Sequence, residues 1–176
     1  MWTYVLIAVL IATAIIAYRI VRQPDTFRVE RSAVIDAPPD RVYALVNDFH
    51  GWSRWSPWAR LDPAARNGFE GPDAGPGAAF LWSGNAKVGE GRMTITESRP
   101  HELVRIRLEF KRPMQATNEA LFTFRPEAGG TRVTWSMSGV NSIMGKAVNL
   151  VMDCDRMVGK SFEEGLANLA VEAKRA

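Results

Sequence analysis

The chain is uniformly apolar near its N-terminus, whereas apolar and polar residues are interspersed in the rest of the sequence. Residues 2–18 carry no charge and are apolar on every side of a helix, whereas helices buried in a soluble core usually keep a polar stripe. A helix over residues 2–21 would be about 30 Å long, which matches the hydrocarbon core of a bilayer if Arg19 snorkels to the interface. Trp2 and Tyr4 lie where interfacial aromatic residues are enriched. The segment therefore predicts a transmembrane anchor over residues 1–22, followed by a linker at residues 23–26.

A cleaved signal peptide is the alternative explanation of this apolar run. No Lys or Arg precedes it, and no small-residue cleavage site follows it before Arg19, Arg22 and Pro24, so we favour a retained, single-pass anchor. Because Arg19 and Arg22 follow the span and only the terminal amine precedes it, the positive-inside rule places the soluble domain in the cytoplasm. The lone Cys154 agrees, since small exported domains more often carry paired cysteines.

After Pro24 the pattern changes to an alternation with period two, which is typical of strands. In residues 27–35, the apolar side chains of Phe27, Val29, Ala33 and Ile35 share one face. The same alternation recurs over residues 79–82, 89–98, 103–111, 115–125 and 131–138, and a short strand is expected near Phe69. Turn sequences rich in Gly, Asn and Ser separate these runs, so the sequence predicts an antiparallel meander.

Two helical segments interrupt the early part of this meander. The first begins at a proline pair and carries an apolar stripe over residues 39–48. The second holds three tryptophans, Trp52, Trp55 and Trp58. Pro57 forbids a regular helix there and predicts a short turn that breaks before it, with one of Trp55 and Trp58 packed inward and the other nearer the rim. Packing over the end of the sheet is the favoured role of this cluster, and a gate or a bilayer contact is the alternative.

The last pattern consists of apolar residues three and four apart and predicts one long amphipathic C-terminal helix. Its stripe is Ile143, Ala147, Val151, Cys154, Val158, Phe162, Leu166 and Leu169. Three glycines weaken such a helix by about 1 kcal/mol each relative to alanine, so a bend near Asp153 is expected. A curved antiparallel sheet wrapped around this helix would bury both apolar surfaces. The sequence therefore predicts an α+β domain over residues 27–176.

The residues of these elements also resemble a known family. Five motifs occur in order: FRVERS from Phe27, APPDRVY from Ala37, WSRWSPW from Trp52, GTRVTW from Gly130 and MVGKSFEEGLANL from Met157. Together they resemble the START-like (SRPBCC) superfamily, more narrowly its bacterial polyketide cyclase/dehydrase and lipid-transport branch, over nearly all of the chain after Asp25. The resemblance implies a helix-grip fold that encloses an elongated apolar cavity, with a shared pocket rather than a catalytic triad. With the anchor, it places the protein in the bacterial inner membrane.

Strand alternation by itself nominates the wall of such a cavity. The candidates are Phe80, Trp82, Met93, Ile95, Ile106, Leu108, Asn118, Phe122, Phe124, Trp135 and Met137, to which the tryptophan segment adds Trp55. A solid core made of the same side chains is the alternative. Aromatic and Met side chains suit irregular ligands, which favours a pocket. An amide at Asn118 would be costly on an apolar face without a partner, and we expect a backbone or water partner more than a ligand.

Charge and motifs speak against several other classes of protein. The net charge of +3 includes Arg19 and Arg22, so the domain is nearly balanced, and no basic stripe indicates nucleic-acid binding. No G-x-S-x-G, P-loop or C-x-x-C motif occurs, and His50 and His101 lack metal-ligand spacing, so we expect no metal, cofactor or catalytic set. Glu97 alternates with the inward-facing Met93 and Ile95 and is the best acid-base candidate, although we expect it not to serve.

Two functions of different classes remain. The favoured one is a membrane-tethered binding module for a hydrophobic small molecule or lipid that partitions from the bilayer. The alternative is a cyclase or dehydratase that acts on an apolar substrate in the same cavity, and we lean against an enzyme. A scaffold whose cavity is filled by its own side chains is a third possibility. A continuous cavity of about 300 Å³ or more would separate the first two from the third, and a buried acid or histidine in it would favour the enzyme.

Overall fold

The period-two segments pair into a single curved antiparallel sheet. In the computed structural model, which describes residues 1–150 and 153–175, seven strands lie in the order β1-β7-β6-β5-β4-β3-β2. They are β1 (Thr26–Ile35), β2 (Arg66–Glu70), β3 (Ala79–Ser83), β4 (Glu90–Arg99), β5 (Leu103–Arg112), β6 (Ala116–Glu127) and β7 (Gly130–Val140). Each predicted strand is present, including the short one around Phe69, so the predicted meander is confirmed. The first strand lies at one edge of the sheet and pairs with the last, from Thr26 opposite Val140 to Ile35 opposite Thr131.

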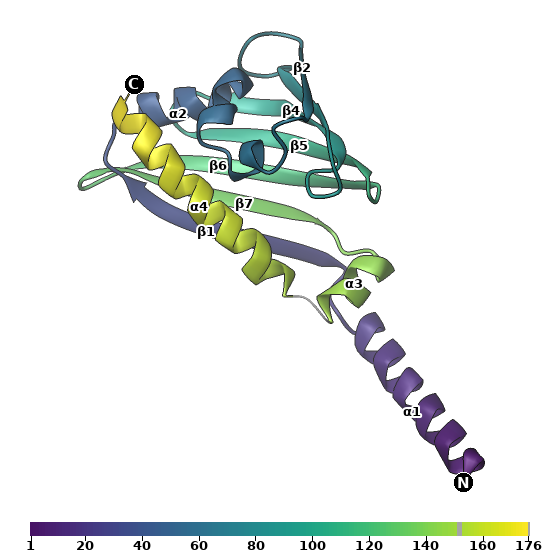
Figure 1. The fold of residues 1–176 in the computed structure, drawn as a ribbon. Helices are drawn as coiled ribbons and strands as arrows, with labels where there is room; N and C mark the ends of the chain where they lie inside the picture. Colours follow the sequence, from purple (N-terminus) through teal and green to yellow (C-terminus); the bar gives the residue numbers. More distant parts are fainter. Residues whose placement is uncertain (151–152, 176) are drawn as a thin grey trace.

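Helical segments accompany the sheet (Figure 1). They are α1 (Trp2–Val21), α2 (Pro39–Asn47), the 3-10 helices η1 (Phe49–Arg54) and η2 (Pro57–Arg60), α3 (Ile143–Asn149) and α4 (Cys154–Arg175). The long helix α4 runs along β1, and α2 packs on the same face against β5, β6 and β7 (Figure 1). A curved sheet that holds a long C-terminal helix is the predicted helix-grip fold, which the structure confirms.

The core lies between the inward face of the sheet and these helices. Along β1, Val29 and Ile35 are buried while their charged neighbours are exposed, because successive side chains of a strand point to opposite faces. On α4, Phe162, Leu166 and Leu169 recur at helical spacing and are each at most 2% exposed. Burial of each such side chain stabilises the fold by roughly 1.5–3 kcal/mol, so the apolar stripe determines which side of α4 faces the sheet.

The predicted single C-terminal helix is two helices in the structure. Ser142 begins α3, where its Oγ accepts a hydrogen bond from the Gly145 amide at 3.1 Å. Asp153 precedes α4, and its Oδ1 accepts from the Arg156 amide at 2.9 Å, which is a side-chain N-cap. A cap satisfies the free amides of a new helix, so the expected bend near Asp153 is a break with a restart. Val151, one position of the predicted stripe, lies outside the described residues.

The N-terminal helix stands apart from the core. α1 buries none of its side chains and projects away from the sheet as a separate rod (Figure 1). By length and composition it is able to cross a membrane. Apolar side chains exposed on all sides of a helix are unfavourable in water, so the exposed surface of α1 suits an apolar environment.

Candidate functional site

The predicted cavity wall divides into two halves on the inward face of the sheet. We call the first the closed half: Trp55, Ile95, Ile106, Phe122, Phe124 and Trp135, each at most 3% exposed. We call the second the open half: Phe80, Trp82, Leu108, Asn118 and Met137, each only partly buried. Met93, at 9% exposure, joins the two. The structure therefore brings the predicted residues onto one face but covers only part of them.

Aromatic rings pack directly on one another in the closed half. Trp135 lies between Phe122, whose ring centroid is 4.7 Å away, and Phe162 of α4, whose centroid is 4.2 Å away at 9° between planes. α4 approaches this closely because position 165 is glycine: a Cβ atom there would lie 2.7 Å from Trp135 Cζ3. Stacked rings each add about 0.5–1.5 kcal/mol beyond their burial, so this half is a rigid floor.

The tryptophan segment belongs to the closed half and divides as predicted. Trp55 is fully buried while Trp58 is 37% exposed, which confirms that the two diverge at Pro57. The indole Nε1–H of Trp52 donates to the Val46 carbonyl at 3.0 Å, and that of Trp55 donates to the Leu45 carbonyl at 3.2 Å. These carbonyls lie in the last turn of α2, where backbone acceptors lack partners within the helix. Trp52 and Trp55 therefore fasten α2 to the core, a role that their spacing alone did not reveal.

One polar atom in the closed half has no partner. Trp135 Nε1–H is the only buried side-chain donor or acceptor without a hydrogen bond in the part of the chain that the structure describes. A buried donor without an acceptor costs roughly 1–3 kcal/mol. The donor therefore lies inside the packed aromatic cluster of the closed half.

From β3 to β5, the open half is a continuous run of apolar side chains across neighbouring strands. Phe80 pairs with Met93, and Met93 pairs with Leu108. Trp82 lies flat over Gly91, where a Cβ atom would meet its ring at 2.5 Å, and its Nε1 donates to the Val88 carbonyl at 3.0 Å. Two further partly buried residues have inward parity, Phe27 and Phe110. Strand alternation in the sequence already assigns Phe110 to the same face as Ile106 and Leu108.

Asn118 lies at the edge of the open half, opposite Leu108 on one side and Gly139 on the other. A Cβ atom at Gly139 would lie 2.2 Å from Asn118 Oδ1, so the amide rests directly over this glycine. We expected a backbone or water partner for the Asn118 side chain, and no hydrogen bond to it forms among the described residues. The residue instead borders a groove of about 480 Å³ that also contacts Arg107 and Glu119 on the outward face.

The structure corrects the placement of Glu97. A β-bulge between Ile95 and Glu97 shifts the register of β4 against β5, so that Glu97 pairs with Arg105 rather than continuing the inward alternation. Arg105 lies between two buried inward residues of β5 and therefore faces outward. Its Nε donates to Glu97 at 3.0 Å, and this hydrogen bond, with a second from Arg99, lowers the pKa of the Glu97 carboxyl. A carboxylate held charged on the outer face cannot be the acid of an inner cavity.

The histidines also lie outside the cavity wall. His50 stacks on Phe69 at 4.1 Å between ring centroids and bonds to Asp48 through Nδ1 at 2.8 Å. His101 occupies the turn between β4 and β5 with a φ of 62°. Both side chains are exposed.

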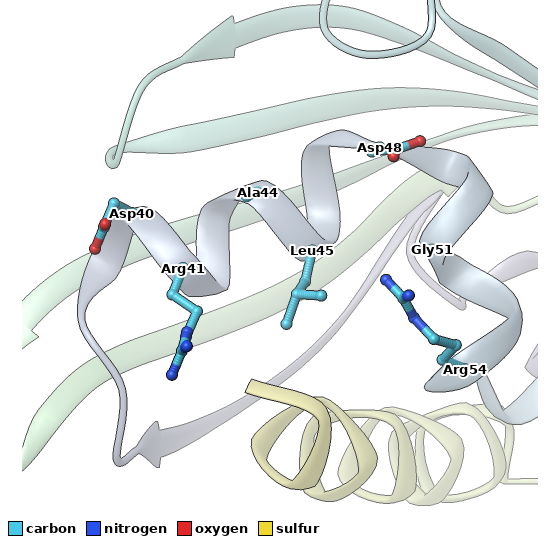
Figure 2. A pocket seen from close by; sticks show the side chains of 7 residues that line it. All are labelled: Asp40, Arg41, Ala44, Leu45, Asp48, Gly51 and Arg54. Carbon is cyan, nitrogen blue, oxygen red and sulfur yellow. The ribbon is translucent and has the colours of Figure 1, made fainter. Parts of the chain in front are cut away.

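A second groove, which sequence analysis did not predict, lies between α2, η1 and the C-terminal end of α4. It has a volume of about 440 Å³ and is lined by Asp40, Arg41, Ala44, Leu45, Asp48, Gly51 and Arg54. Figure 2 shows Arg41 and Leu45 projecting from α2 toward α4, with Arg54 reaching in from η1. Arg54 is held by Glu172 of α4 at 2.9 Å. Acidic and basic side chains alternate along the groove. The groove therefore has no dominant charge and does not match an apolar ligand.

Comparisons with known proteins agree with this geometry. A family model described as polyketide cyclase / dehydrase and lipid transport matches residues 26–174. The chain belongs to this family. The match covers the sheet and α4 and begins after α1. The family assignment therefore applies to the domain and does not include the N-terminal helix. The predicted resemblance is thereby confirmed. No curated protein matches the chain at a significant level.

Solved structures share the fold of this family member at low sequence identity. Protein CV1439 from Chromobacterium violaceum is 19% identical, with 86% of this chain and 98% of that chain covered and a TM-score of 0.59. Protein MLL2253 from Mesorhizobium loti is 17% identical, with 86% and 98% covered and a TM-score of 0.60. The di-domain ARO/CYC StfQ of the steffimycin biosynthetic pathway is 11% identical, with 85% and 51% covered and a TM-score of 0.63. These likenesses establish the fold and carry no activity over to this chain.

Proposed function

We propose that the protein is a membrane-tethered binding module for a hydrophobic small molecule or lipid, which binds on the open half. The observation that carries this proposal is the row of partly buried apolar side chains that the helices leave uncovered beside a fully packed floor. Contiguous apolar surface of this kind is costly in water and is relieved when an apolar molecule covers it. The family description, which includes lipid transport, supports the same class of ligand.

A polar group at the border of this site suits a ligand with a polar end. The Asn118 amide is partly buried, and no hydrogen bond holds it among the described residues. A polar atom on the ligand would satisfy this amide, since buried polar groups are normally hydrogen-bonded. We therefore expect an amphiphile rather than a plain hydrocarbon.

The tether rests on α1, whose length and composition suit one span. We place it in the bacterial inner membrane with the domain in the cytoplasm, because Arg19 and Arg22 follow the span. A site held beside the bilayer has direct access to molecules that partition into lipid. Binding is favoured over catalysis because the strands place no carboxylate or histidine at inward positions in the described part of the sheet, and Glu97 faces outward.

Native mass spectrometry of the full chain, released from lipid nanodiscs, tests this proposal. We expect an apolar adduct on the parent protein and its loss in Leu108→Gln, which places an amide at a partly buried position of the open half. Ala120→Trp, at the closed border, should also displace it, although overpacking there costs about 1–3 kcal/mol of stability. Ala167→Trp on the exposed side of α4 is the matched control and should keep the adduct. If the folded chain binds no apolar molecule from a broad lipid panel, the result contradicts the binding proposal and supports the scaffold alternative.

A further inference from the structure

The joint between α1 and the domain is fixed by hydrogen bonds and is not a loose linker. Gln23 Nε2 donates to the Lys146 carbonyl at 2.8 Å, and Lys146 Nζ donates to Asp25 Oδ1 at 2.5 Å. Asn141 donates from its side chain to the Pro24 carbonyl at 3.2 Å and from its backbone to the Asp25 carbonyl at 2.7 Å. Asn141, just before α3, and Lys146, within α3, therefore hold the segment that leaves α1, and Figure 1 shows α3 beside that exit.

Residues 140–150 present an apolar surface at this joint, beside the exposed carboxylate of Asp25. Val140 and Ile143 are each 76% exposed, Met144 is 59% exposed and Leu150 is 40% exposed. We call these four residues the docking face. The only charged side chain in residues 140–150 is that of Lys146. This residue is only 6% exposed and is paired with Asp25. A soluble surface would place charged residues here, so this cluster is expected to contact an apolar partner.

We propose that the docking face lies in the headgroup region of the bilayer that α1 spans, a conclusion that rests on the proposed tether. The hydrogen-bonded joint keeps α3 next to the membrane exit of α1, so lipid is the partner that always lies within reach. A short helix with exposed apolar residues and no exposed charge suits the boundary between headgroups and acyl chains. Val140 follows Gly139, which contacts Asn118, so the same orientation turns the near end of the open half toward the membrane.

Depth-dependent fluorescence quenching of the full chain in vesicles tests this arrangement. Cys154→Ser removes the native thiol, and Met144→Cys or Ile143→Cys then carries an environment-sensitive dye. Val171→Cys is the matched control. Val171 is an exposed apolar residue too, at 52%, but it lies near the far end of α4. The vesicles contain phosphatidylcholine and phosphatidylglycerol, with a nitroxide near the top of the acyl chain.

We expect roughly twofold or greater quenching at positions 143 and 144 relative to position 171, with a blue-shifted emission at the first two. Equal quenching at all three positions would overturn the docking face. Carbonate extraction of the same vesicles separates this failure from that of the tether. A chain that resists extraction without selective quenching refutes only the docking face, whereas a chain that carbonate releases refutes the tether on which it rests. Unchanged thermal melting of the labelled chains confirms that the substitutions leave the fold intact.

Discussion

Single residues decide how closely α4 approaches the sheet. Gly165 admits the Trp135 ring, and Gly159 admits the guanidinium of Arg31, since a Cβ atom at position 159 would lie 2.0 Å from Arg31 Nη2. Arg31 in turn bonds to Asp155 at 3.0 Å and to Glu163 at 2.9 Å, both on α4. These hydrogen bonds raise the pKa of the Arg31 guanidinium, with the bond from Asp155 the larger cause. The glycines that weaken α4 as an isolated helix are therefore the positions that permit its packing.

Phe162→Ala should destabilise the folded chain by about 3–5 kcal/mol, because it removes a ring that is 1% exposed and stacked on Trp135. Chemical denaturation of the solubilised full chain measures this loss. Val171→Ala, at an exposed position of the same helix, is the control and should change the free energy of unfolding by less than about 0.5 kcal/mol. A loss below about 1 kcal/mol for Phe162→Ala would show that α4 does not pack on the sheet as described.

The Glu97 carboxyl should titrate below the usual glutamate range. Hydrogen bonds from Arg105 and then Arg99 favour its charged form and lower its pKa in the folded state. Its contribution to stability is therefore fully present above the unfolded pKa and is lost as the pH falls through the lower, folded pKa. An NMR titration of the side-chain carboxyl carbon would show this midpoint, and Arg105→Gln should move it upward. A midpoint above the usual range would instead be the mark of a proton-donating acid.

At the scale of elements, the break between α3 and α4 separates two tasks. α4 carries the buried stripe and completes the core, whereas α3 holds the joint to α1. The Lys146 ammonium of α3 is buried and its partner Asp25 is exposed, and the hydrogen bond between them lowers the pKa of Asp25. A buried cation without its partner is costly, so this one contact couples the linker to the domain.

Asp25→Ala should therefore lower the melting temperature more than loss of an ordinary surface ion pair does, because it leaves the Lys146 ammonium unpaired. Lys146→Met should cost less, and the double variant should resemble Lys146→Met alone. Thermal melting of the detergent-solubilised chain gives the comparison. The matched control is Asp36→Ala, which removes an exposed carboxylate whose partner, Lys174, is also exposed, at 58%. Such a surface pair is worth about 0–1 kcal/mol, so equal losses for Asp25→Ala and Asp36→Ala would contradict a special role for the joint.

At the scale of the whole molecule, a family domain follows a helix of bilayer length. The family match begins at residue 26, next to the joint, and runs to residue 174. One domain thus contains the closed half, the open half and the docking face. A short, hydrogen-bonded connection joins this domain to α1. If α1 spans the membrane, this connection restricts how the domain can turn above the lipid.

The full chain should remain in the membrane pellet after a carbonate wash, because a 20-residue apolar helix is long enough to span the hydrocarbon core. In intact cells the domain should resist external protease, since Arg19 and Arg22 follow the span. Permeabilised cells are the control and should allow cleavage. A mature N-terminus near Arg19 would reveal a cleaved signal peptide, and cleavage in intact cells would reverse the orientation.

The sequence by itself determined the element order and the inward face of most strands. This was possible because strand alternation and helical spacing record directly which side chains leave water. Local chemistry also predicted the divergence of Trp55 and Trp58, since Pro57 interrupts the segment between them wherever it packs. The family motifs lay on these same elements, so the fold followed from the sequence.

Only the tertiary structure decided which inward residues are covered and which remain open. Alternation assigns Phe122 and Leu108 to the same face, but the helices above the sheet determine that the first is buried and the second is not. A one-residue bulge turned Glu97 outward, because the side chains of a strand alternate with period two and one extra residue reverses the face that follows. The joint that holds the docking face beside α1 likewise consists of hydrogen bonds between residues more than a hundred positions apart, and no local pattern along the chain records such contacts.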